Sequence, residues 1–131
     1  MKLAILIGVT EYSNGLNHLP ACKKDVETME KVVYSTGEFD QVLCLSDNES
    51  AKQTKDKLSD FIEKNKNQQI DELFFYFTGH GDFYENEFYF ILNDFNQNKR
   101  KQTSLENSEV DKLIKSLSPA LTVKIVDACH S

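Results

Sequence analysis

The chain has 131 residues and a mass of 15.0 kDa, and its 40% hydrophobic and 27% charged residues are the balance of one soluble globular domain. Its net charge is −6, and its 15 Lys and Arg residues are scattered, which excludes the basic stripe that a nucleic-acid partner requires. No apolar run approaches the roughly 20 residues of a membrane span, so we expect no membrane association.

The first half of the chain predicts two strand–helix units. Leu3–Val9 is short and almost wholly apolar, which is typical of a strand buried in a parallel sheet. A helix then runs from Pro20, a favoured first helical residue, to Gly37, a favoured terminator. Gln41–Leu45 predicts a second strand, and Ala51–Lys64 predicts a second, weakly amphipathic helix.

The second half begins with the strongest buried-strand pattern, Leu73–Phe77, which leads directly into a Thr-Gly-His-Gly string at 78–81. We interpret that string as lying at the carboxyl end of the strand. The remaining predicted elements are a hairpin strand at Phe88–Leu92, a polar loop from 93 to 103, a helix that begins at Ser104 or Asn107 and ends at Leu117, and a strand at Leu121–Val126. This order predicts an α/β fold whose mostly parallel sheet has helices on both faces.

Two residues with catalytic chemistry follow these strands: His80 lies between two glycines, and Cys129 closes the final apolar run. Sites in open α/β sheets form beyond the carboxyl ends of the strands, so we expect the two residues to meet. A thiol needs a base, a cation or a helix terminus to become a nucleophilic thiolate, and His80 is the base that we assign. Gly81 would leave its N–H exposed to a developing oxyanion, together with the N–H of Cys129.

Each motif also has a purely structural interpretation, because a strand cysteine is usually a packing residue and Gly-His-Gly is often only a turn. Their joint placement favours the catalytic interpretation. His130 and His18 are competing bases, but His130 would point to the opposite side of an extended strand and His18 follows no strand. Cys22 and Cys44 fall inside a predicted helix and a predicted strand, where we expect them in the core.

The cysteine pattern bears on the compartment as well. Three cysteines form no CxxC pair and no zinc-like cluster, which argues against a disulfide framework and against a structural metal. We therefore expect a reducing, cytoplasmic location.

With these motifs, the whole chain resembles the caspase-like cysteine peptidases, in particular the metacaspases and their bacterial relatives. The strings that carry the resemblance are LIGV at 6–9 with Tyr12, LPACKKD at 19–25, YFTGHG at 76–81 and DACHS at 127–131. Cys129 follows His80 by 49 positions, close to the roughly 50 in caspases. The resemblance implies a three-layer α/β/α sandwich and an endopeptidase in which Cys129 attacks the peptide carbonyl and His80 transfers protons. That chemistry requires no metal or organic cofactor.

The substrate pocket that the resemblance implies is acidic. Asp127 stands where caspases proper have a glutamine, as in metacaspases, which cleave after arginine or lysine. A carboxylate beside the pocket would bind a guanidinium through two hydrogen bonds. Asp25 is a second candidate for the pocket wall, although it could instead be a helix-start carboxylate that the helix dipole favours.

The chain stops two residues after Cys129, whereas related enzymes continue with a small-subunit region. We therefore interpret residues 1–131 as the large-subunit portion of a catalytic domain whose sheet is incomplete at its C-terminal edge. The strand at Leu121–Val126 would then present an exposed apolar edge, which isolated proteins avoid. We expect this portion alone to be poorly stable and nearly inactive without the small-subunit region.

Three further expectations concern function. Acidic residues near His80, such as Asp82 and Glu85, would suit a loop at which calcium acts as an activator, as in many metacaspases, although no ligand spacing defines a site. A non-catalytic scaffold for assembly or signalling is the alternative function, but such a protein would usually lack one of the two dyad residues. A flavodoxin-like nucleotide-binding domain is a third hypothesis, and the absence of a GxGxxG or Walker string after the first strand argues against it.

Overall fold

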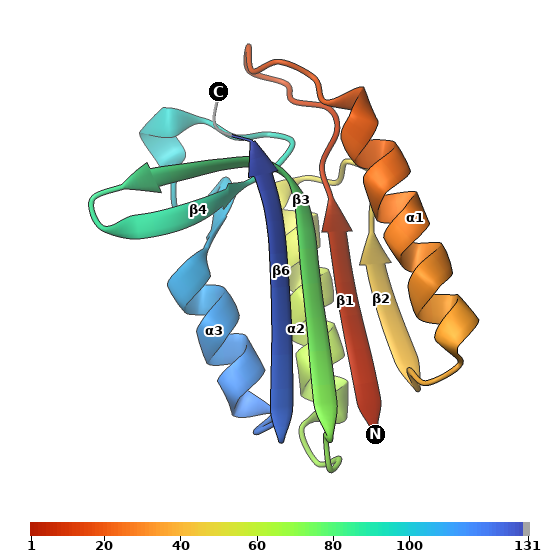
Figure 1. Ribbon diagram of the computed structural model, residues 1–131. Helices are drawn as coiled ribbons and strands as arrows, with labels where there is room; N and C mark the ends of the chain where they lie inside the picture. Colours follow the sequence, from red (N-terminus) through yellow and green to blue (C-terminus); the bar gives the residue numbers. More distant parts are fainter. Residues whose placement is uncertain (130–131) are drawn as a thin grey trace.

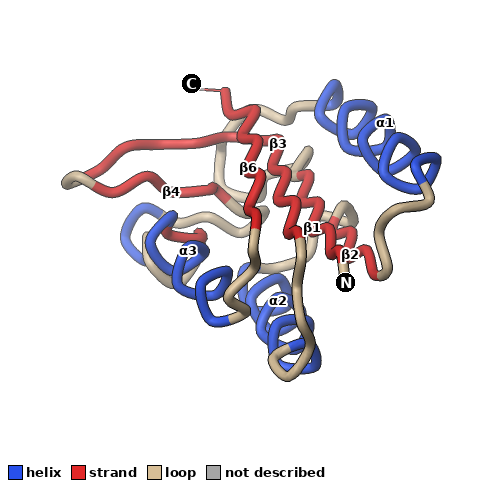
Figure 2. Tube along the Cα trace, turned by 60° about the horizontal axis from the view of Figure 1, so that its bottom comes forward, coloured by secondary structure: helices blue, strands red, loops and turns tan. Residues whose placement is uncertain are grey.

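Four parallel strands form the centre of the molecule, with one helix on one face and two on the other (Figures 1 and 2). The structure is a computed structural model and describes residues 1–129. In chain order the elements are β1 (Lys2–Gly8), α1 (Pro20–Thr36), β2 (Gln41–Leu45), α2 (Ala51–Asn65), β3 (Glu72–Tyr84), β4 (Glu87–Ile91), the 3₁₀ helix η1 (Gln97–Lys99), β5 (Ser104–Glu106), α3 (Asn107–Ser116) and β6 (Leu121–Cys129). No helix among the described residues has the length and apolar character that would let it cross a bilayer.

The sheet changes character along β3. The parallel part has the order β2-β1-β3-β6, and β3 pairs in it from Glu72 to His80. Beyond His80 the same strand continues as an antiparallel hairpin with β4, which in turn pairs with β5. Figure 1 shows this hairpin projecting sideways from the carboxyl end of the parallel strands.

Two apolar cores flank the sheet. On the side of α1, Val26 and Val33 pack against Ala4, Leu6 and Tyr76. On the other side, a larger core joins α2 and α3 to the alternate strand residues; its largest fully buried members are Phe75, Phe77 and Phe90. Since residues alternate between faces along a strand, this division follows directly from the almost wholly apolar runs in β1 and β3.

The helix boundaries follow local sequence signals. Pro20 is the first residue of α1, and Gly37 ends it in the left-handed conformation with φ 65°. Ser50 begins α2 with a capping box: its side chain accepts from the Gln53 N–H, and the Gln53 side chain accepts from the Ser50 N–H. These signals place both helices within a residue or two of the ranges that the sequence predicts.

The predicted α/β architecture is confirmed, with three corrections. The strand that contains Phe77 does not end there, because Thr78–Gly81 lies inside β3. The short strand β5 was not predicted; it begins at Ser104, and α3 begins at Asn107. Asp25 is the sixth residue of α1, beyond the first turn, so the helix-dipole interpretation of Asp25 is wrong.

Strand β6 lies at an edge of the sheet. Within residues 1–129, β3 is the one strand that pairs with it. Leu121, Ile125 and Val126 are 52%, 42% and 40% exposed, so the final strand presents the partly uncovered apolar surface that the sequence predicts.

Lys124 interrupts the apolar pattern of β6 and ties the strand to α3. Its ammonium group donates to Asp111 Oδ1 at 2.8 Å and to Asn107 Oδ1. It also lies 5.8 Å from the centroid of the Phe90 ring. Because a slip of one residue would carry Lys124 to the opposite face, these contacts favour a single register for β6.

The aromatic core gives a direct test of the fold. Replacing the fully buried Phe77 with alanine should lower the free energy of unfolding by about 3–5 kcal/mol, because it removes a large side chain and leaves a cavity. Phe83→Ala is the matched control: this ring is 68% exposed, and its loss should cost under about 1 kcal/mol. Urea unfolding of the full-length protein measures both, and equal losses would contradict the assigned core.

Candidate active site

The parallel ladder between β3 and β6 brings the two predicted catalytic residues together. It runs from Glu72 opposite Leu121 to His80 opposite Cys129, so His80 and Cys129 are register partners at its last rung. Neighbouring strands lie about 4.8 Å apart, which places the two backbones within reach of a side-chain interaction. The Cys129 side chain and His130 lie outside the described part of the chain, so the choice of His80 over His130 as the base stays a prediction.

His80 is held by the loop between β1 and α1. The residue is 3% exposed, and its backbone N–H donates to the Tyr12 hydroxyl oxygen at 2.8 Å. Its ring Nε2 lies 2.8 Å from the carbonyl oxygen of Asn17. A carbonyl can only accept, so this contact requires the hydrogen on Nε2 and makes Nδ1 the basic nitrogen of a neutral imidazole.

Asparagine side chains fix this loop from the opposite side. Asn48 Oδ1 accepts from the backbone N–H groups of Thr10 and Glu11 at 2.8 and 3.0 Å. Asn93 Nδ2 donates to the Glu11 carbonyl at 2.8 Å, and the Asn93 carbonyl accepts from the Ser13 N–H at 2.9 Å. These bonds connect the loop to the segments that follow β2 and β4, so two further connections support the position of His80.

Steric contacts explain why glycines stand on both sides of His80. Gly79 has φ 154°, and a Cβ there would lie 2.9 Å from the Tyr12 hydroxyl and 3.0 Å from the Phe77 ring. A Cβ on Gly81 would lie 2.4 Å from the Phe88 ring and 2.8 Å from the Ala128 methyl group. Both positions therefore need glycine so that the backbone can pack closely around the histidine.

Asp127 and Asp25, the two residues predicted for the substrate pocket, both affect the pKa of the buried Tyr76 phenol. Burial raises the pKa of Tyr76, and the negative charges of Asp127 and Asp25 raise it further, while the Thr78 hydroxyl acts in the opposite direction. Asp127 is opposite Thr78 in the β3–β6 ladder, and Asp25 comes from α1. The structure thus brings these two aspartates, 102 positions apart in the sequence, into electrostatic range of the same side chain.

The match to a family model agrees with this geometry. The model of the caspase domain matches residues 1–131. The chain belongs to the caspase-domain family. Comparison with curated proteins gave no match. The family match and the α/β architecture confirm the resemblance that the motifs predict, and the family is one of cysteine peptidases.

The structure also places His18, Cys22 and Cys44, the other histidine and cysteines of the described part of the chain. His18 is exposed, and its Nε2 contacts the Tyr12 carbonyl at 3.2 Å. Cys22 is buried in α1, whereas Cys44 in β2 is only partly buried, which corrects the expectation of a core position. Burial raises the pKa of the Cys44 thiol to about 11, and the Glu30 carboxylate adds to the rise.

Asp82 and Glu85, the acidic residues named for a calcium-sensitive loop, lie in the β3–β4 hairpin. Asp82 accepts from the guanidinium of Arg100 at 2.7 Å, and Arg100 also lies 4.3 Å from the Tyr84 ring centroid. Glu85 is in the turn of the β3–β4 hairpin with φ 50°. Among residues 1–129, no group of three or more His, Cys, Asp or Glu side chains could hold a metal ion.

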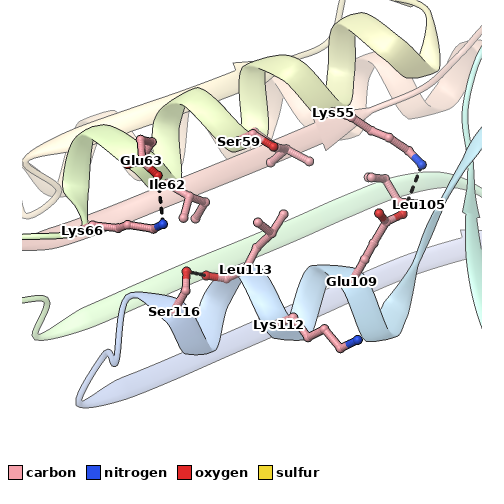
Figure 3. Close-up of a pocket in the computed structure, with 11 residues that line it drawn as sticks. Lys55, Ser59, Ile62, Glu63, Lys66, Leu105, Glu109, Lys112, Leu113 and Ser116 are labelled. Carbon is pink, nitrogen blue, oxygen red and sulfur yellow. Dashed lines mark hydrogen bonds and ion pairs between the residues drawn. The ribbon is translucent and has the colours of Figure 1, made fainter.

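A groove of about 430 Å³ lies apart from these residues, between α2 and α3 (Figure 3). Ile62 and Leu113 approach each other across it, as Figure 3 shows. Ion pairs occupy its rim, with Lys55 3.4 Å from Glu109 and Lys66 2.9 Å from Glu63. It shares no lining residue with the surroundings of His80, and we assign it no part in the chemistry.

Sequence patterns alone did not reveal the residues that position His80. Tyr12 belongs to one of the family strings, and Asn17 belongs to no motif. Each lies more than sixty positions from His80, so the contacts depend on the folded loop. Arg100, which binds Asp82, likewise falls in a segment that the sequence predicts as polar loop.

The raised pKa of Cys44 predicts its reactivity. At pH 7.5 only about one Cys44 thiol in three thousand would be a thiolate, so iodoacetamide should leave it largely unmodified in the folded protein. Mass spectrometry of the native full-length protein, with a urea-unfolded sample as control, measures this. Cys44 modification as fast in the folded as in the unfolded protein would contradict the prediction.

Proposed function

We propose that the chain carries the nucleophile and base of a metacaspase-like cysteine endopeptidase, with Cys129 as nucleophile and His80 as base. The observation that supports this most directly is the register pairing of His80 with Cys129 at the end of two parallel strands. The reducing cytoplasm is the location that we propose, because it would keep the thiol available for catalysis.

The proposed reaction proceeds through a thioester. His80 Nδ1 takes the Cys129 proton, and the thiolate sulfur then attacks the carbonyl carbon of the peptide bond. The carbonyl oxygen becomes an oxyanion, which the backbone N–H groups of Gly81 and Cys129 would stabilise. The imidazolium returns its proton to the nitrogen of the leaving amine, and the C–N bond breaks.

The second half of the cycle hydrolyses the acyl-enzyme. His80 takes a proton from a water molecule, whose oxygen attacks the thioester carbon. The C–S bond breaks, Cys129 recovers its thiol proton from His80, and a peptide carboxylic acid leaves. The contact between Nε2 and the Asn17 carbonyl supports this role because it stabilises the imidazolium formed in both halves.

The proposed preference is for arginine or lysine before the cleaved bond. Support comes from Asp127 and Asp25, whose charges converge on the buried Tyr76. A substrate guanidinium or ammonium group near that phenol would meet two carboxylates and offset their mutual repulsion. Asp127 is the main selector in this proposal, and Asp25 is a second wall.

The proposed partner of the chain, apart from its peptide substrate, is a following small-subunit region. Strand β6 pairs with β3 along one side, and its exposed Leu121, Ile125 and Val126 are the support for this proposal. A further strand would cover that edge and complete the substrate pocket. Activity is therefore best measured on the full-length protein, and we expect residues 1–131 alone to be nearly inactive.

The first test is hydrolysis of a peptide panel that differs only in Arg, Lys or Asp before the scissile bond. The full-length protein should cleave the Arg and Lys peptides, and Cys129→Ala and His80→Ala should each lower kcat by at least roughly 10³-fold. An arm with added calcium tests the expectation that this ion acts as an activator. Activity that survives in Cys129→Ala would reject the dyad, and no cleavage in any arm would favour the scaffold alternative.

The second test concerns the selector. Asp127→Asn should lower kcat/KM for the Arg peptide by roughly tenfold to a hundredfold, because it removes the charge that assists the hydrogen bonds to the guanidinium. Asp25→Asn should have a smaller effect. Asp60→Asn is the matched control, since Asp60 is exposed on α2. A loss for Asp127→Asn no larger than that of the control would reject Asp127 as the selector.

A further inference from the structure

The Tyr12 hydroxyl occupies an unusual place between β1 and β3. Val9 continues the ladder beyond β1, because its N–H donates to the Thr78 carbonyl at 3.0 Å. In a regular parallel pair, the next bond would run from the His80 N–H to the Val9 carbonyl. Instead, the His80 N–H donates to Tyr12 Oη at 2.8 Å, and Tyr12 Oη donates to the Val9 carbonyl at 3.3 Å. The hydroxyl is thus inserted into the ladder at the rung that carries the histidine.

Two features of the surroundings fit this insertion. Gly79 lies opposite the inserted group, and a Cβ there would come within 2.9 Å of Tyr12 Oη and 3.3 Å of the Val9 carbonyl oxygen. The Tyr12 ring is 4% exposed and tilted by 60° to the His80 imidazole, with the ring centroids 4.6 Å apart. The same side chain therefore contacts both the backbone and the ring of His80.

We infer that Tyr12 is a positioning residue for the base: its hydroxyl sets the distance of His80 from β1, and its ring fixes the orientation of the imidazole. This inference rests on the proposed function of His80. With Oη in place, β3 stays spread from β1 at this rung, and the imidazole keeps Nε2 at the Asn17 carbonyl and Nδ1 as the basic nitrogen. Without Oη, the His80 N–H can bond the Val9 carbonyl directly, which draws the histidine toward β1 and away from the β6 rung.

Tyr12→Phe separates positioning from stability, because the ring stays and the direct bond to Val9 can replace the lost ones. We expect kcat for the Arg peptide to fall roughly tenfold to a hundredfold, with KM within about twofold of the wild type, since small displacements of a reacting group are costly. The urea midpoint should change little. Tyr34→Phe is the matched control, because Tyr34 is 61% exposed on α1 and should leave all three quantities unchanged.

A second measurement does not depend on turnover. In full-length Cys129→Ala protein with ¹⁵N-labelled histidine, the nitrogen shifts of His80 report the fraction of the Nε2–H tautomer. We expect that fraction to fall when Tyr12→Phe is added and to stay constant when Tyr34→Phe is added. Unchanged His80 signals, or an unchanged kcat in an active protein, would overturn the positioning role. If the wild type cleaves no peptide, the proposed function fails, and the nitrogen shifts alone decide the role of Tyr12.

Discussion

The parallel ladder between β3 and β6 is the constraint on which the site depends. Side chains alternate between the faces of a strand, so a slip of a single residue would move every β6 side chain to the wrong face. The same slip would put a residue other than Cys129 opposite His80. An apolar edge strand defines its register only weakly. The ammonium group of Lys124 adds a polar constraint, because its partners Asn107 and Asp111 lie at the start of α3. A structural ion pair on one face thus supports the pairing of His80 with Cys129 at the end of the same strand.

His80, the proposed base, lies on strand β3, but the contacts that hold it come from the loop between β1 and α1. A loop that carries so much of the site would ordinarily be mobile, but here buried and amide side chains hold both of its sides. Tyr12 and Asn17 attach it to His80, and Asn48 and Asn93 attach it to the segments after β2 and β4. The entropy lost in ordering the loop is offset by these bonds, so the imidazole is already oriented in the absence of substrate.

The sequence predicts the framework well because its signals there are local. The apolar runs at Leu3–Val9, Leu73–Phe77 and Leu121–Val126 predict the parallel strands, and the sheet rule for site placement predicts that His80 and Cys129 meet. The errors have tertiary causes. Two glycines within Thr78–Gly81 suggest a turn, yet pairing of Thr78–His80 with β6 and of Gly81 with β4 keeps that segment extended. The three residues of β5 carry no local signature, and their strand exists only because β4 lies beside them.

The contacts that hold His80 could not be predicted from the sequence for a similar reason. Neither a tyrosine nor a backbone carbonyl in a loop has a pattern that points to a histidine more than sixty positions later. The inserted hydroxyl is recognisable only when the hydrogen bonds of Val9, Thr78 and His80 are seen together.

The place of β6 in the chain also has a consequence for biosynthesis. Every other described element precedes this strand, and its partner β3 ends 37 positions before it begins. During synthesis the sheet and the loop around His80 can form while the cysteine is still to be added. The nascent polypeptide can therefore pair β1, β2 and β3 before the residue that stands opposite His80 has been added. Pairing with β6 is then the step that brings Cys129 opposite His80.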